Sequence, residues 1–195
     1  MPNWCDNEVW ITGNADELQE LFNEASKPNE RYDDPEHPIK FLMDNLVPMP
    51  TELRDTTAPQ DKPNWYDWSL ENWGTKWDLN QEYDETRVYY TEGDSEGGLN
   101  YLTAWAPNRD FWLRVSKRFP SLRIDLRYIE EGMFFIGQDI IQDGETIDQV
   151  YFNDVPTELC LTVGAVLDAD GKIDWDESNL NLWDLFPLIK QEELV

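Results

Sequence analysis

Side chains that could bind or react with a ligand are concentrated in the run Asn72–Asp78, which reads Asn-Trp-Gly-Thr-Lys-Trp-Asp. Two indoles, an ammonium group and a carboxylate surround one glycine, which allows the backbone to turn or to approach a neighbour closely. We expect Trp73 and Trp77 to insert into the body of the domain, so that Lys76 and Asp78 are held at a fixed place. The alternative is a structural corner with an internal Lys–Asp pair, since aromatic side chains usually serve packing first.

A binding pocket is one function that this run could serve. Its indoles would stack a base-like or aromatic ligand, while Lys76 would hold an anionic group. The strand that is expected to end near Trp105 would bring a third indole to the same place. The candidate pocket residues are Asn72, Trp73, Lys76, Trp77, Asp78 and Trp105.

Other catalytic or metal-binding arrangements find little support. The single histidine, His37, stands in a proline-rich segment that predicts a surface loop, so a Ser-His-Asp or Cys-His site is disfavoured. With 41 acidic residues, no pair of carboxylates stands out for acid–base work. The run Asp168–Glu177 resembles a calcium loop, but its first ligand position would be Val166, and a turn at Asp170-Gly171 explains the same residues. We therefore predict a protein that is not an enzyme and has no metal and no cofactor.

The strands and helices expected around these residues follow a recognisable order. Residues 3–11 alternate as a strand, and a helix follows with a capping box at Asn14–Glu17 and an apolar stripe at 18, 21, 22 and 25. Residues 64–72 predict a short helix that leads into a turn at Gly74. Strands are expected at 86–91 and 99–105, on either side of an acidic turn or loop at 92–98. A helix over 109–119 and a strand over 122–128 complete a β-α-β-β-α-β order, the split βαβ arrangement of α+β, ferredoxin-like folds.

The C-terminal third predicts additional hairpins. Asp143-Gly144 separates two β-like runs, 133–142 and 145–152, and is a strong hairpin signal. Asp170-Gly171, between 161–167 and 172–175, predicts a second hairpin. Residues 180–194 favour a short docked helix or apolar clasp, with a stripe that Pro187 interrupts. The predicted organisation is a ferredoxin-like core over residues 1–135 with a Trp-rich insertion, and an acidic hairpin extension over 136–195 packed on it.

The charge of the chain restricts its partners. Its 41 acidic and 15 basic residues give a formal net charge of −26 and a sequence pI near 4.1. Direct binding to nucleic acid or to an anionic membrane is therefore disfavoured, and no apolar run reaches the roughly 18 residues of a membrane span. Cys5 and Cys160 match no metal or redox spacing, which favours a reduced, cytoplasmic protein.

Three explanations of the acidity remain open. The simplest is solubility or a salt-rich habitat. The second is an acidic surface that attracts a basic partner. The third is a special case of the second: because duplex DNA carries one charge for about every 1.7 Å of its axis, a protein with rows of carboxylates can occupy a DNA-binding groove.

Four motifs together resemble a known family. They are Asn3-Trp4-Cys5-Asp6-Asn7, Leu46-Val47-Pro48-Met49-Pro50, the run Asn72–Asp78, and Thr103-Ala104-Trp105-Ala106-Pro107. In this order they resemble the YubB-type, ferredoxin-like proteins of plasmids and bacteriophages, a family without an assigned biochemical activity. The resemblance covers about residues 2–132. It implies a ferredoxin-like fold and a mobile-element origin, and it carries over no catalytic residue.

This origin favours a function in which the acidity serves inhibition. The first hypothesis is a phage or mobile-element inhibitor, located in the host cytoplasm, whose DNA-mimicking acidic surface binds the basic groove of a host nuclease, restriction or CRISPR-type complex. The alternative is the small-ligand or enzymatic pocket around the run Asn72–Asp78. A third reading is an acidic structural or assembly protein without a ligand. The acids expected to form the partner surface are Asp139, Asp143, Glu145, Asp148, Asp168, Asp170, Asp174, Asp176 and Glu177.

Overall fold

The fold is given by a computed structural model, which describes residues 3–32, 38–79, 86–132, 135–174, 177–178 and 181–192. The strands are β1 (Trp4–Thr12), β2 (Arg87–Tyr89), β3 (Glu96–Ala104), β4 (Arg123–Glu130), β5 (Phe135–Gln142) and β6 (Glu145–Asn153). The α-helices are α1 (Ala15–Ala25), α2 (Met43–Leu46), α3 (Trp65–Trp73), α4 (Arg109–Arg118), α5 (Thr157–Thr162) and α6 (Phe186–Glu192). Two short 3-10 helices are η1 (Thr51–Leu53) and η2 (Leu182–Leu185).

The strands form one antiparallel sheet in the order β2-β3-β1-β4-β5-β6. Its first four strands, connected through α1 and α4, have the order of a split βαβ unit, which confirms the predicted α+β, ferredoxin-like fold. The hairpin of β5 and β6 extends this sheet beyond β4, as Asp143-Gly144 predicts. α2, η1 and α3 belong to the long segment between α1 and β2.

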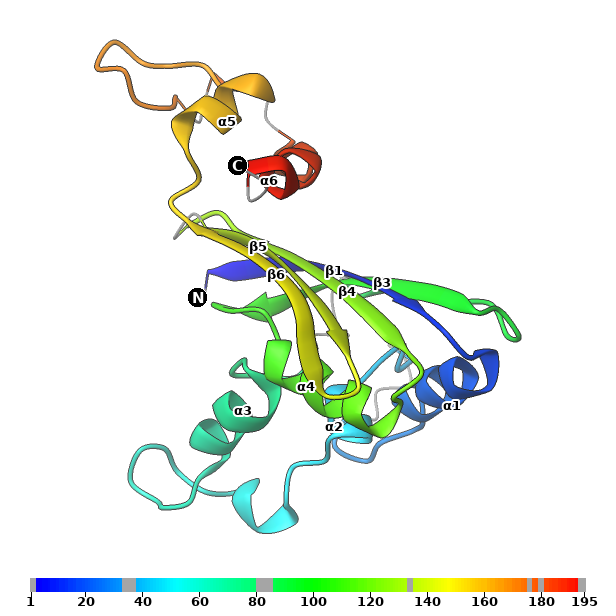
Figure 1. The fold of residues 1–195 in the computed structure, drawn as a ribbon. Coiled ribbons are helices and arrows are strands. Elements are labelled where there is room, and N and C mark those ends of the chain that lie inside the picture. The colour runs from blue at the N-terminus through cyan, green and yellow to red at the C-terminus, as the bar shows by residue number, and fades with distance from the viewer. Residues whose placement is uncertain are drawn as a thin grey trace.

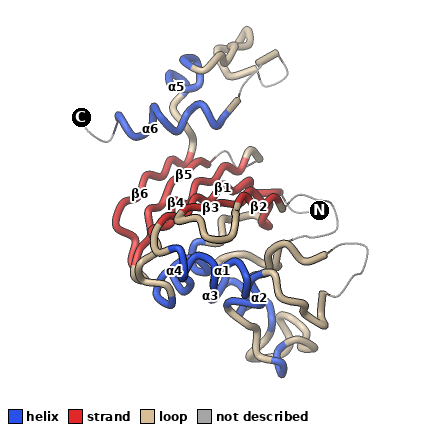
Figure 2. Tube along the Cα trace, turned by 90° about the vertical axis from the view of Figure 1, so that its right-hand side faces the viewer, coloured by secondary structure: helices blue, strands red, loops and turns tan. Residues whose placement is uncertain are grey.

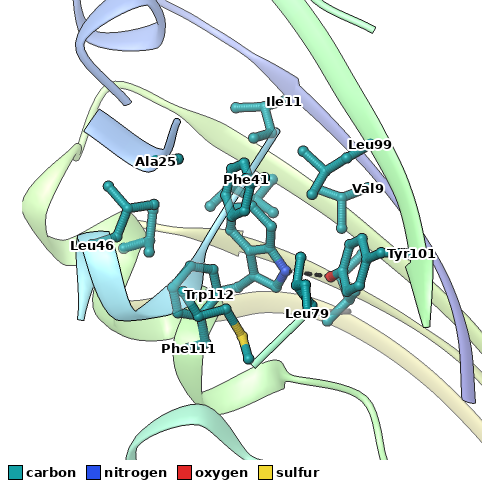
Figure 3. Close-up of a cluster of buried hydrophobic side chains, with 14 of the residues drawn as sticks. Val9, Ile11, Ala25, Phe41, Leu46, Leu79, Leu99, Tyr101, Phe111 and Trp112 are labelled. Carbon is teal, nitrogen blue, oxygen red and sulfur yellow. Dashed lines mark hydrogen bonds between the residues drawn. The ribbon is translucent and has the colours of Figure 1, made fainter. Parts of the chain in front are cut away.

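Helices lie on both sides of the sheet (Figures 1 and 2). We call the side that faces α1–α4 the first face, and the side that faces α5 and α6 the second face. The core of the first face is aromatic: Trp112 donates from Nε1 to the Tyr101 hydroxyl at 2.8 Å, beside Phe41 and Phe111 (Figure 3). On the second face, Ile129, Ile136 and Val150 are buried against residues of α5, η2 and α6. The sheet is therefore covered on both faces where Ile129, Ile136 and Val150 lie.

Local sequence explains the first helix. Asn14 accepts from the amides of Asp16 and Glu17, and the predicted stripe is buried. Only half of the predicted capping box forms, because a Glu17 carboxylate oxygen accepts from the Ser121 amide at 3.3 Å. Glu17 thus ties the start of α1 to the turn before β4.

The predicted second hairpin forms only in part. Residues predicted to begin its first strand form α5 instead, which follows Pro156, and the turn at Asp170-Gly171 closes with a single bridge between Leu167 and Ile173. The acidic turn before β3 is also shorter than predicted, since β3 begins at Glu96 and not at Leu99. Pro187 does not interrupt the C-terminal helix, because it stands in the first turn of α6, where a missing N–H breaks no helical hydrogen bond.

Among the described helices, none combines the length and the apolar character that a membrane span requires.

Candidate functional site

The backbone of the Asn72–Asp78 run turns at Gly74, as predicted. α3 ends there, with Gly74 at φ 79° and its amide bonded to the Leu70 carbonyl. A Cβ at this position would lie 3.2 Å from the Pro107 carbonyl oxygen and 3.1 Å from Oδ2 of Asp110. Both the left-handed conformation and the close approach to the start of α4 therefore require glycine.

Thr75 fixes the next residues of the run beside the end of β3. Its buried hydroxyl donates to the Ala104 carbonyl at 3.0 Å and accepts from the Ala104 amide at 3.1 Å. The sequence does not reveal this role of Thr75, because a buried hydroxyl with two backbone partners cannot be recognised from spacing alone. The contact places Lys76 and Trp77 next to Trp105.

Lys76 lies against three aromatic rings. Its Nζ is 4.2 Å from the ring centroid of Trp77, 5.0 Å from that of Trp105 and 6.0 Å from that of Tyr66. The rings of Trp77 and Trp105 stack with centroids 6.3 Å apart, and the ring centroid of Trp4 lies 6.4 Å from that of Trp77. We call Trp4, Lys76, Trp77 and Trp105 the indole cluster.

The indole cluster is a surface feature. Trp77 and Trp105 are 41% and 40% exposed, so the prediction that Trp77 inserts into the domain is wrong. Trp105 has φ 67°, a conformation that costs a bulky residue on the order of 1–3 kcal/mol, and its amide donates to the Asn3 carbonyl at 3.0 Å. The cluster therefore offers apolar ring surface and one positive charge at a strained turn.

The other candidate pocket residues serve the fold. Trp73 is 1% exposed, and its Nε1 donates to the Val47 carbonyl at 3.0 Å, so its predicted insertion is confirmed. The Asn72 amide donates to the Trp68 carbonyl of the same helix at 2.9 Å. Neither side chain joins the indole cluster through these contacts.

Asp78 caps α2. Its Oδ1 accepts from the amides of Met43 and Leu79 at 2.8 and 2.7 Å, and its Oδ2 accepts from the Asp44 amide at 2.8 Å. Burial raises the pKa of the Asp78 carboxyl to about 6, against the lowering effect of these amides. None of the ion pairs in the described part of the chain joins Lys76 to Asp78, so the expected internal Lys–Asp pair is not seen.

Asp139 is not a surface acid, contrary to the prediction. It is 0% exposed in β5 and pairs with Nε of Arg109, at the start of α4, at 3.0 Å. Burial raises the pKa of its carboxyl, and the Arg109 guanidinium opposes that rise. The prediction failed because Asp139 lies on the first face of β5, which the start of α4 covers at this point.

The remaining acids fall into two groups. The hairpin acids, Asp143, Glu145 and Asp148, are exposed at the β5–β6 turn and along β6. The loop acids, Asp168, Asp170, Asp174 and Glu177, follow α5; Asp174 is half-buried and the others are exposed. Asp176, also predicted here, lies outside the described residues, as does His37.

The two groups lie at opposite ends of β6. The hairpin turn is beside α4, where the Gly144 amide donates to the Ser116 hydroxyl, whereas the loop lies beyond α5 (Figure 1). Nine residues of β6 span about 30 Å. The structure therefore gives two separate acidic regions in place of the single row that was expected.

Arginines of the α4–β4 region are bonded to carboxylates of the chain itself. Arg118 donates to Glu24 and lies 3.5 Å from Glu20. Arg127 is 3.2 Å from Asp125 and 3.9 Å from Glu8. The positive charge of these arginines is therefore neutralised within the fold and does not balance the exposed acids.

Within the described ranges, no three His, Cys, Asp or Glu side chains come together in a way that could hold a metal ion. Oδ1 of Asp168 in the calcium-like run accepts from the amides of Asp170 and Lys172 at 2.9 and 2.8 Å. This carboxylate therefore holds a turn closed.

Comparison with family models agrees with the fold. Residues 72–157 match the family model described as the ferredoxin-like domain in Api92-like protein, a stretch that includes Lys76, Trp105 and the β5–β6 hairpin. A crystal structure of protein api92 from Yersinia pseudotuberculosis aligns with 80% of this chain and 100% of its own length, at 11% identity and a TM-score of 0.47. Comparison with curated proteins gave no match.

Proposed function

We propose that the protein is a non-enzymatic inhibitor, carried by a phage or another mobile element, that binds the basic nucleic-acid-binding surface of a host defence or nucleic-acid-handling protein. The observation that carries the proposal is the exposure of the hairpin acids. None of the ion pairs among the described residues uses Asp143, Glu145 or Asp148. Their charge is therefore available to a partner, while the arginines Arg109, Arg118 and Arg127 are held by internal carboxylates.

The spacing of the hairpin acids suits imitation of a short length of DNA backbone. Glu145 and Asp148 lie opposite Gln142 and Ile140, which are two positions apart in β5, a separation of about 7 Å along the strands. The phosphates of one DNA strand follow each other at about 3.4 Å along the axis, so this separation corresponds to about two phosphate steps. With a net charge of −26, the whole molecule would also accelerate its encounter with a basic surface, and salt would weaken this attraction.

The experiment uses two charge-matched variants. One replaces the hairpin acids by amides (Asp143→Asn, Glu145→Gln, Asp148→Asn), and the other changes three exposed loop acids (Asp168→Asn, Asp170→Asn, Glu177→Gln). Each immobilised protein captures partners from a bacterial lysate, with low-salt and then high-salt washes. The DNA or RNA binding of each captured protein is then measured with and without the inhibitor.

We expect the wild-type protein to retain a nucleic-acid-binding protein at low salt and to block its binding to DNA or RNA. The hairpin variant should lose this inhibition by about tenfold or more, and the loop variant should retain it. The proposal fails if both variants inhibit as well as the wild type, or if the captured proteins still bind nucleic acid when the inhibitor is in excess.

The indole cluster supports a second candidate, a small-ligand site. A planar anion could stack on Trp77 or Trp105 while its charged group meets Lys76, an arrangement that the cation–π geometry favours. Titration with nucleotides and aromatic acids, followed by tryptophan fluorescence, tests this candidate. Lys76→Ala should abolish binding of a planar anion, and an unchanged titration in that variant would exclude Lys76 from the site.

A further inference from the structure

β6 is the long open edge of the sheet. It pairs with β5 on one side, and no strand of the described chain pairs with its other side. The opposite edge, β2, has only three residues, whereas β6 has nine. An edge strand directs alternate N–H and C=O groups outward, so β6 offers a row of backbone partners to another extended chain.

A bulge divides this edge. The register shifts between Ile140 and Ile141, so that Ile140 lies opposite Asp148, Ile141 lies opposite Thr146, and Ile147 has no opposite residue. Such a bulge twists the strand and interrupts pairing locally. The regular part of the edge is therefore Asp148–Asn153.

The side chains of the regular part suit a neighbouring strand. Tyr151 is 50% exposed and ends an aromatic row that crosses the first face from Tyr128 through Phe135, with centroids 6.2 and 6.0 Å apart. On the second face, Val150 is buried under the C-terminal helices. An added strand would thus lie beside an edge that is covered on its second face and that offers one large aromatic ring on its first face for a cross-strand contact.

Charge decides which strand fits. β6 has no lysine, arginine or proline, the residues that commonly block an edge, and its charged residues are Glu145 and Asp148. Exposed Asp143 precedes it and exposed Asp154 follows it. A second copy of this chain would bring the same acids and a further charge of −26, so the edge repels its own copy and attracts a basic segment.

We propose that the partner docks by adding an extended, basic segment beside β6, paired with the backbone of Asp148–Asn153. This inference rests on the proposed inhibitory function and names its mode of contact. Backbone hydrogen bonds would supply affinity, Tyr151 would pack against a side chain of the added strand, and the hairpin acids would meet its cationic residues.

The test uses defined peptides and the full-length protein. The probe is a blocked peptide of alternating arginine and valine, and its control is the fully N-methylated peptide, which keeps the charge but donates no backbone hydrogen bond. Two protein variants place a lysine on an edge: Tyr151→Lys on β6, and Tyr89→Lys, a similarly exposed tyrosine on β2, as the matched control. Calorimetry measures affinity, and amide hydrogen exchange locates the contact.

We expect the N-methylated peptide and the Tyr151→Lys variant each to lose about tenfold or more in affinity, and the Tyr89→Lys variant to bind normally. Hydrogen exchange should slow at β6 and not at β2. Equal binding of the two peptides, equal losses in the two variants, or no binding at all would overturn strand addition. The hairpin-acid experiment stands apart from these results, because inhibition that depends on those acids would support the proposed function even if the edge were not used.

Discussion

At the scale of single residues, burial gives Asp78 a chemistry that its position in the sequence does not reveal. Three backbone amides bond to its carboxylate, yet burial raises its pKa from the ordinary 3.8 to about 6. The folded protein therefore takes up this proton before the unfolded chain does. The stability that Asp78 contributes is complete below about pH 4 and is lost as the pH rises through 6.

The Asp78→Asn variant should show this dependence by difference. Between pH 4 and 7, the unfolding free energy of the wild type should fall relative to that of the variant by on the order of 2 kcal/mol. Urea unfolding at several pH values gives the unfolding free energy of both proteins. Subtracting one from the other removes the contribution of the other titrating acids. A difference that is independent of pH would contradict the raised pKa.

The ion pair of Asp139 and Arg109 gives a second prediction about single residues. Removing the guanidinium in Arg109→Ala would leave a buried carboxylate without its cation, which should cost about 2 kcal/mol at neutral pH. Because the folded-state pKa of Asp139 is raised, this deficit should shrink as the pH falls and the carboxyl is protonated. Thermal unfolding at two pH values checks both statements. The double variant Arg109→Ala/Asp139→Asn should recover stability at neutral pH, and a double variant as unstable as the single one would exclude the charge as the cause.

At the scale of elements, the packing of β4 on β5 depends on one glycine. A Cβ at Gly137 would collide with Cζ and the hydroxyl oxygen of Tyr128, whose ring is buried over the strand. Gly137→Ala should therefore destabilise the protein by about 1–3 kcal/mol. Differential scanning calorimetry gives the shift in Tm. Adding Tyr128→Leu, which removes the clashing atoms, should restore part of the loss; no recovery would show that the cost arises elsewhere.

The same elements show what the sequence could and could not predict. The β5–β6 hairpin was predictable because Asp143 and Gly144 both adopt positive φ, 51° and 77°, which the Asp-Gly pair favours. The end of α5, Leu161–Thr162, was mistaken for the start of a strand because a short apolar run does not distinguish the two, and Pro156 as a helix start was overlooked. Trp105 was expected to lie near Trp77, but the exposure of the two stacked rings was not, since it depends on how Thr75 anchors to β3.

For the molecule as a whole, sequence reasoning expected a docked C-terminal helix but could not show which face of the sheet it covers. The run Phe135–Gln142 does not alternate, and such a pattern is typical of a strand that is buried on both faces. The fold of the ferredoxin-like part follows from periodicity and turn signals, whereas the cover of the second face depends on contacts between β5 and helices far along the chain. Asp139 lies on the other face of β5, where it pairs with Arg109 at the start of α4, so its burial also depends on a contact between distant parts of the chain.

The net charge gives a prediction for the molecule as a whole. Self-repulsion at −26 should destabilise the folded state at low ionic strength, so the Tm should rise as sodium chloride is added. A variant in which both the hairpin acids and the loop acids are changed to amides should gain less from the same salt. Thermal unfolding at a series of salt concentrations measures both, and a Tm that falls or stays level in the wild type would contradict the argument.

Each face of the sheet covers one cysteine, so the opening of each side can be followed in time. Cys5 is a free thiol buried under the first face, and Cys160 is a free thiol buried under the second. Burial raises the pKa of both thiols, so neither reacts with an alkylating reagent until its surroundings open. The alkylation rate of each cysteine therefore times the opening of one side of the sheet independently of the other.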